Sequence, residues 1–121
     1  MAACLAVCWL WVWGASSALA EDVRVGSKRF TESYILAQMM AQTAQAAGAK
    51  VQVLQGLGNT AIVYEALRSG QIDVYAEYTG TIAQEIIKDP SYAELESLRQ
   101  ALAPLNLDVG VPLGFNNGYA L

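Results

Sequence analysis

The sequence predicts an α/β fold, with a mostly parallel sheet and crossover helices, over residues 21–121. Short β-forming segments alternate there with segments in which apolar residues recur at helical spacing. Turns rich in Gly, Ser and Thr separate these segments. The order strand, helix, strand, helix, strand, helix is typical of parallel strands whose connecting helices cover the faces of the sheet.

Residues 1–20 differ from the rest of the chain because they contain no charged side chain. An apolar core from Leu5 to Trp13 precedes a small-residue Ala-x-Ala end, which is typical of a secretory signal peptide. The alternative is a membrane anchor, but this core is much shorter than the roughly 20 residues that span a bilayer. We therefore expect cleavage between Ala20 and Glu21 and a periplasmic mature protein, with residues 21–121 as its first part.

The composition of the mature part excludes several classes of function. The chain has no His, and Cys4 and Cys8 both lie in the predicted leader. Disulfides, thiolate chemistry and the usual metal sites are therefore not expected, and no cofactor is predicted. The net charge is −4 at pH 7 and no basic cluster occurs, so nucleic-acid binding is not expected either.

The first predicted unit is a strand at 23–25 followed by a helix. Gly26 and Ser27 end the strand pattern, and Thr31 with Glu32 is a helix-start signal. Apolar residues then follow at helical spacing until Gly48, which we expect to end the helix.

The second unit repeats this order. A strand is predicted at 51–54, and the Gly-rich stretch 56–60 is predicted to turn into a helix capped by Asn59 or Thr60. The helix carries its apolar face over 62–67 and is expected to end at Gly70.

The remaining elements follow from weaker signals. A buried strand is predicted at 72–75, and a helix is predicted over 82–88, ending before Pro90. Ser91 is predicted to cap another helix that runs to about Leu102. Two strand candidates come last, one at Val109 and Val111 and one beginning at Phe115.

Each strand-to-helix turn carries polar or small residues, at 26–31, 56–60 and 78–81. The carboxyl ends of parallel strands meet at one edge of a sheet, which is where ligands bind in open α/β folds. Ordinary helix capping explains one such residue per turn. Three hydroxyl-bearing turns together with Lys28 point instead to a small anionic or zwitterionic ligand. The turn at 56–60 is not a phosphate loop, because it lacks a third Gly and a Gly-Lys-Ser/Thr sequence.

Five segments together resemble the substrate-binding proteins of ABC importers for glycine betaine, choline and related osmoprotectants. They are VGSKRFTE at 25–32, LGNT at 57–60, YEAL at 64–67, IDVYAEYTGT at 72–81 and FNNGYAL at 115–121. The resemblance implies a periplasmic-binding-protein-like (type II) fold, in which two α/β lobes close on the ligand about a hinge. Residues 21–121 would then be the first lobe, with the second lobe expected beyond Leu121.

The resemblance also implies a set of binding residues. Lys28 would contact a carboxylate of the ligand, and Thr81 would donate a hydrogen bond to that carboxylate. Tyr78 and Tyr119 would form walls of an aromatic cage around a trimethylammonium group, and a backbone carbonyl near Asn117 would face the same cation. Aromatic rings suit this ligand because a quaternary ammonium has no N–H to donate and is held through cation–π attraction.

The resemblance implies two partners, a small quaternary-ammonium ligand and the permease of an ABC importer, with membrane contact only through the permease. A rival hypothesis is an enzyme on the same two-lobed fold. The mature residues offer no His, no Cys and no nucleophile elbow, so no enzymatic activity is predicted. Glu77 is a single acid and is interpreted as a structural partner. A binding domain fused to the importer's membrane domain and a ligand-sensing regulatory domain are two further hypotheses.

Overall fold

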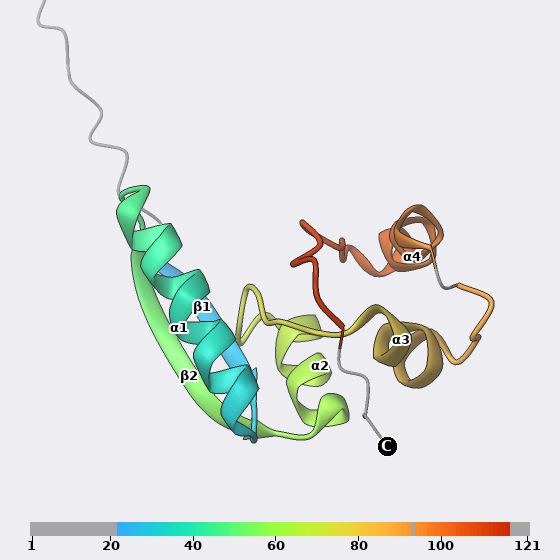
Figure 1. The fold of residues 1–121 in the computed structure, drawn as a ribbon, viewed down its shortest axis with the longest axis horizontal. Helices are drawn as coiled ribbons and strands as arrows, with labels where there is room; N and C mark the ends of the chain where they lie inside the picture. Colours follow the sequence, from blue (N-terminus) through green and yellow to red (C-terminus); the bar gives the residue numbers. More distant parts are fainter. Residues whose placement is uncertain (1–21, 93, 117–121) are drawn as a thin grey trace, which may run out of the picture.

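A computed structural model describes residues 22–92 and 94–116 of the chain (Figure 1). The predicted leader lies outside this range, as do residues 117–121. The larger elements are β1 (Asp22–Lys28), α1 (Thr31–Ala46), β2 (Lys50–Gly58), α2 (Thr60–Arg68) and α4 (Leu95–Leu102). Three shorter helical segments complete the set: α3 (Thr79–Thr81), the π-helix η1 (Ile82–Ile87) and the 3₁₀-helix η2 (Ala103–Leu105).

Strands β1 and β2 pair in parallel, and α1 connects them, which confirms the predicted strand–helix–strand unit. Val23 lies opposite Val51, and Val25 lies opposite Val53. Figure 1 shows α1 running along the length of this two-stranded ribbon. Both strands extend beyond the apolar residues that predicted them.

A bulge interrupts the pairing near the end of β1. Between the pairs Gly26–Leu54 and Lys28–Gly58, β1 contributes Ser27 alone, whereas β2 contributes residues 55–57. The Ser27 hydroxyl accepts a hydrogen bond from the Gly56 N–H at 2.8 Å, which satisfies a backbone group that the ladder leaves unpaired. Gly56 has a φ of +71°, a conformation that favours glycine. Residues 56–58 of the predicted turn are therefore the last part of β2, and the bulge fixes the direction in which β1 ends.

The sheet has a hydrophobic core on each face. On the α1 face, Val25 packs with Ala37 and Ala41. On the α2 face, Val63 and Ala66 pack with Ile72. Residues of β2 alternate between the two, because Val53 contacts the first core and Leu54 the second. Helix α2 begins as predicted, with the Asn59 side chain accepting a hydrogen bond from the Ile62 N–H.

The prediction of a strand at 72–75 is wrong. Within this segment, only Val74 forms a β-bridge, to Val25 of β1. The Asp73 carboxylate accepts the hydrogen bond of the Arg24 N–H at 2.7 Å, so a side chain occupies a donor that a longer ladder would use. The segment nevertheless lies beside β1.

The predicted Ser91 cap is also wrong, because the helix begins at Leu95. Asp89 accepts hydrogen bonds from both the N–H and the hydroxyl of Ser91, which holds Ser91 in a preceding turn. The strand candidate at Val109 and Val111, which the structure describes in full, forms no strand. Side chains engage its backbone instead, since Asp108 accepts from the Val109 N–H and Arg99 donates to the Val109 carbonyl.

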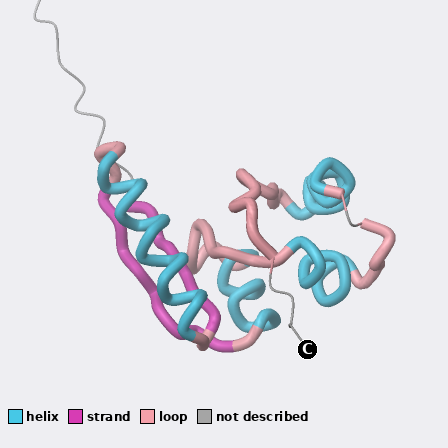
Figure 2. Tube along the Cα trace, in the orientation of Figure 1, coloured by secondary structure: helices cyan, strands magenta, loops and turns pink. Residues whose placement is uncertain are grey.

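The part of the chain after α2 therefore contains helices and loops without a strand ladder among its described residues (Figure 2). Its core consists of Ile82 and Ala83 from η1 and of Leu98 and Leu102 from α4. None of the helices in the described residues is long and apolar enough to cross a membrane.

Candidate functional site

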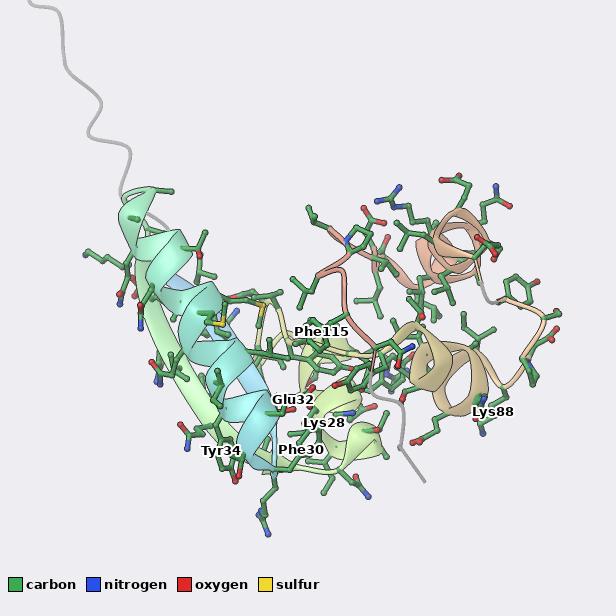
Figure 3. All side chains as sticks on the ribbon, in the orientation of Figure 1. Lys28, Phe30, Glu32, Tyr34, Lys88 and Phe115 are labelled. Carbon is green, nitrogen blue, oxygen red and sulfur yellow. The ribbon has the colours of Figure 1, made fainter. Side chains whose placement is uncertain are left out.

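A cavity of about 1050 Å³ lies where the two parts of the molecule meet. Its wall combines residues of α1, α2, η1, the segment 73–79 and the segment 106–116. Lys28 at the end of β1 also lines it, and the same lysine borders a smaller cavity of about 420 Å³ beside Asn59 and Thr60. Figure 3 shows Lys28, Glu32 and Phe30 close together at the N-terminal end of α1.

Lys28 forms an ion pair with Glu77 inside this wall. The Lys28 Nζ lies 2.5 Å from the Glu77 Oε1, and the two side chains are only 9% and 5% exposed. The Tyr78 N–H donates to the same carboxylate oxygen at 3.0 Å. The Lys28 ammonium also lies 5.3 Å from the centre of the Phe30 ring, within the range of a cation–π contact. Glu77, interpreted from the sequence as a structural partner, thus pairs with the lysine that is predicted to meet the ligand.

The second carboxylate oxygen of Glu77 is different. Oε2 is buried and has no hydrogen-bond partner among the described residues. Burial raises the pKa of Glu77 above its ordinary value, while the contact with Lys28 opposes that rise. The Tyr75 hydroxyl lies close enough to Glu77 to lower the pKa of that carboxyl slightly.

Tyr78 lines the large cavity. Its hydroxyl donates a hydrogen bond to Glu32 in the first turn of α1. Its ring meets that of Phe115 edge to face, with the ring centroids 6.3 Å apart and an interplanar angle of 88°. Phe115 was not expected from the sequence as a binding residue, although this aromatic begins the segment that contains the predicted Tyr119.

The other predicted residues fall in different places. Thr81 is half-buried in α3, and the lining of the large cavity takes Thr79 of that turn rather than Thr81. Asn117 and Tyr119 lie outside the described residues. The first two predicted turns are in contact, because the Arg29 N–H donates to the Gly58 carbonyl. The first and third lie close together, because Lys28 pairs with Glu77 and Tyr78 binds Glu32, each one residue outside a turn.

The charges on the cavity wall favour a cationic group. Two further carboxylates of the wall have arginine partners that do not line the cavity: Asp73 pairs with Arg24 at 2.8 Å, and Asp108 lies 3.6 Å from Arg99. Closer to Tyr78, a single lysine, Lys28, stands against two carboxylates, Glu32 and Glu77. Among the residues that the structure describes, no group of three or more potential ligands could hold a metal ion.

The family comparison covers the whole of the predicted mature part. Residues 21–121 match the family described as the substrate-binding domain of the ABC-type glycine betaine transport system. A glycine-betaine-binding protein of Pseudomonas aeruginosa is 38% identical over 98% of this chain. A carnitine transport binding protein, OpuCC, of Listeria monocytogenes is 33% identical over 66% of this chain. The chain spans 38% of the length of the first relative and 28% of the second.

The structural comparison agrees with the sequence comparison. The solved structure of apo YehZ from Escherichia coli superposes with a TM-score of 0.60 at 29% sequence identity. The alignment covers 70% of this chain and 32% of that one. The fold is therefore periplasmic-binding-protein-like, and the described residues form part of such a domain.

Proposed function

Because the chain belongs to the family of substrate-binding domains of ABC-type glycine betaine transport systems, we propose that it captures a quaternary-ammonium osmoprotectant for uptake. Glycine betaine and choline are the ligands proposed. The names of the two sequence relatives, which refer to glycine betaine and carnitine, support this choice of chemical class. The proposal concerns the intact protein, since the chain spans well under half of either relative.

The arrangement of Tyr78 and Phe115 is the observation that carries the proposal. Their rings are nearly perpendicular and both line the cavity, so together they form a corner. A trimethylammonium group in this corner would contact both aromatic rings. Carboxylates outnumber the one ammonium beside this corner. A trimethylammonium group is held by aromatic faces, each contributing about 0.5–2 kcal/mol depending on desolvation, and is favoured by nearby negative charge.

The remaining predicted residues keep the roles that the resemblance implies. We propose that Lys28 and Thr81 serve ligands that carry a carboxylate, that Tyr119 adds a further aromatic wall, and that a backbone carbonyl near Asn117 faces the cation. Glycine betaine would use all of these groups. Choline, which lacks a carboxylate, would rely on the aromatic and carbonyl groups.

The proposed partner in the cell is the permease of an ABC importer, and the proposed location is the periplasm. We also propose that the protein binds its ligand without transforming it. Residues 21–121 contain neither His nor Cys, the side chains that most often serve as general base or nucleophile at neutral pH.

Replacing Tyr78 tests the proposal. In the intact protein, Tyr78→Ala is expected to weaken choline and glycine betaine binding by more than about tenfold, because it removes one cation–π contact and opens the corner. Isothermal titration calorimetry measures both affinities. Tyr34→Ala is the matched control, since Tyr34 of α1 packs near Gly56 and does not line the large cavity. Equal affinities in wild type and Tyr78→Ala would remove Tyr78 from the site, and absence of binding by the wild type would refute the proposed function.

A further inference from the structure

We propose that Glu77 determines which quaternary ammonium the site prefers, an inference that rests on the proposed function. A ligand with a hydroxyl group binds with the Lys28–Glu77 pair intact and donates its hydroxyl to Glu77. A ligand with a carboxylate binds only when Glu77 releases Lys28 and takes up one proton from solvent. Glu77 is thus a specificity-determining residue for ligands that share the same cationic head.

The ammonium of Lys28 already has a partner, the carboxylate of Glu77. The ammonium lies 2.5 Å from Glu77, and both side chains are at least nine-tenths buried. A carboxylate that approached Lys28 would therefore also approach the carboxylate of Glu77. Two carboxylates in one buried place cannot both remain ionised without a large electrostatic cost, and the usual result is that one of them binds a proton.

Other titratable groups lie near Glu77 on neighbouring elements. From α1, Glu32 accepts the hydrogen bond of the Tyr78 hydroxyl. From η1, Glu85 contributes repulsion that raises the pKa of Glu77. Tyr75 precedes Glu77 in the same segment, and its hydroxyl is neutral because burial raises its pKa. None of these groups can replace the positive charge of Lys28.

One carboxylate oxygen of Glu77 has no hydrogen-bond partner among the described residues. Oε2 of Glu77 is buried, belongs to a residue of the cavity wall and accepts no hydrogen bond from the described residues. A buried acceptor without a donor costs free energy that a donor on the ligand recovers. A hydroxyl supplies such a donor to the ionised carboxylate, whereas a ligand carboxylate is acceptor-only and forms a hydrogen bond with Glu77 only when Glu77 itself carries the proton.

Choline and glycine betaine form a suitable pair of probes. Both carry a trimethylammonium head on a two-carbon chain, and they differ in ending with a hydroxyl or a carboxylate. The aromatic corner contributes equally to both. Any difference in the number of protons that the two ligands take up on binding therefore arises at Lys28 and Glu77.

The experiment counts protons during binding to the intact, unmodified protein. Calorimetric titrations in two buffers with different ionisation enthalpies are expected to show uptake of up to one proton with glycine betaine and none with choline. Above neutral pH, the affinity for glycine betaine is expected to fall by up to about tenfold for each further pH unit, while the affinity for choline stays constant.

Glu77→Gln provides the matching variant because it keeps the size of the side chain and removes its charge. It is expected to abolish proton uptake with glycine betaine. The ratio of the dissociation constants, glycine betaine over choline, is expected to fall by about tenfold or more, which corresponds to about 1.4 kcal/mol. Glu96→Gln is the control, since Glu96 is exposed, lies outside the cavity wall and does not affect the pKa of Glu77; it should leave both ligands' proton counts unchanged.

The outcomes separate this inference from the proposed function. If both ligands bind without proton uptake and respond equally to pH, the role of Glu77 is refuted while the proposed function stands. If neither ligand binds the wild type, the proposed function fails and the inference fails with it. Should Glu77→Gln not fold, the proton count in the unmodified protein still decides the question.

Discussion

The two ends of β1 carry ion pairs to the same neighbouring segment, and the pairs are built differently. Arg24 pairs with Asp73 and Lys28 with Glu77, each across 49 residues of sequence. The Arg24 and Asp73 side chains are 37% and 40% exposed. Those of Lys28 and Glu77 are almost completely buried. Position along the strand thus decides whether water solvates the charges.

The two pairs also differ in how many carboxylate oxygens accept a hydrogen bond. Asp73 accepts from the backbone N–H, Nε and Nη2 of Arg24, so each of its oxygens is engaged. Glu77 has one oxygen engaged and the other without a partner among the described residues. The pKa shifts are opposite: hydrogen bonds from Arg24 lower the pKa of Asp73, whereas burial raises that of Glu77. Both oxygens of Asp73 are therefore engaged, whereas Oε2 of Glu77, a residue of the cavity wall, can still accept a hydrogen bond.

The largest effect on stability is expected from Lys28→Met, which leaves the carboxylate of Glu77 buried without a counter-ion. Breaking a buried pair in this way costs about 3–5 kcal/mol. Burial then holds the pKa of Glu77 above its ordinary value of 4.5 without opposition. The penalty is present when Glu77 is ionised near neutral pH, and it shrinks as the pH falls and Glu77 binds a proton. Urea unfolding followed by circular dichroism at several pH values measures it.

The double variant Lys28→Met/Glu77→Leu is the control for that measurement. It removes both charges, and it should recover most of the stability that Lys28→Met loses. Lys28→Met with wild-type stability at neutral pH would show that the buried pair contributes nothing.

A smaller effect is expected from Gly26→Ala, between the two pairs on β1. A Cβ at this position would lie 2.5 Å from Cδ1 of Ile72, whose side chain is itself buried. The resulting overpacking is expected to cost about 1–3 kcal/mol and to push the segment after Ile72 away from β1. Gly80→Ala is the control, since a Cβ there meets nothing within 4 Å. If the urea midpoints of the two variants coincide, the close packing of Gly26 against Ile72 does not contribute to stability.

The smallest effect is expected from Asp73→Asn at the solvated pair. The amide can still accept from the Arg24 N–H, and water screens the lost charge. Because the pKa of Asp73 is lowered, its carboxylate stabilises the fold at neutral pH and loses that effect as the pH falls below 3.8. The unfolding midpoints of wild type and variant should therefore converge in acid. A constant difference over the whole pH range would indicate that charge is not involved.

The strand–helix–strand part of the fold could be predicted because its signals are local. Alternating valines mark β1 and β2, and Asn59 has the side chain that a helix start requires. The third strand could not be predicted correctly, since the Asp73 carboxylate substitutes for a ladder partner. Ser91 failed as a cap for a similar reason, because Asp89 engages it first. In both cases a short acidic side chain competes with the backbone for hydrogen bonds.

The site was predictable in part. Lys28 and Tyr78 lie at the cavity, whereas the pairing of Lys28 with Glu77 was not anticipated. A signal for it exists in the sequence: Arg24 and Lys28 are four residues apart, as are Asp73 and Glu77. Residues four apart on extended segments share one face, so adjacent parallel segments with opposite charges at this spacing would align both pairs at once. Phe115 could not be found this way, because its contact with Tyr78 depends on how the last segment folds back.

The single bridge between Val25 and Val74 has a consequence for the entropy of the chain. Joining these residues closes a loop of 49 residues, and both ion pairs close loops of the same length beside it. Closing such a loop costs on the order of 3 kcal/mol in conformational freedom, yet a second link next to the first adds little to that cost. Whichever of the three contacts forms first therefore brings the other two within reach. The bridge and the two pairs should form and break as one unit.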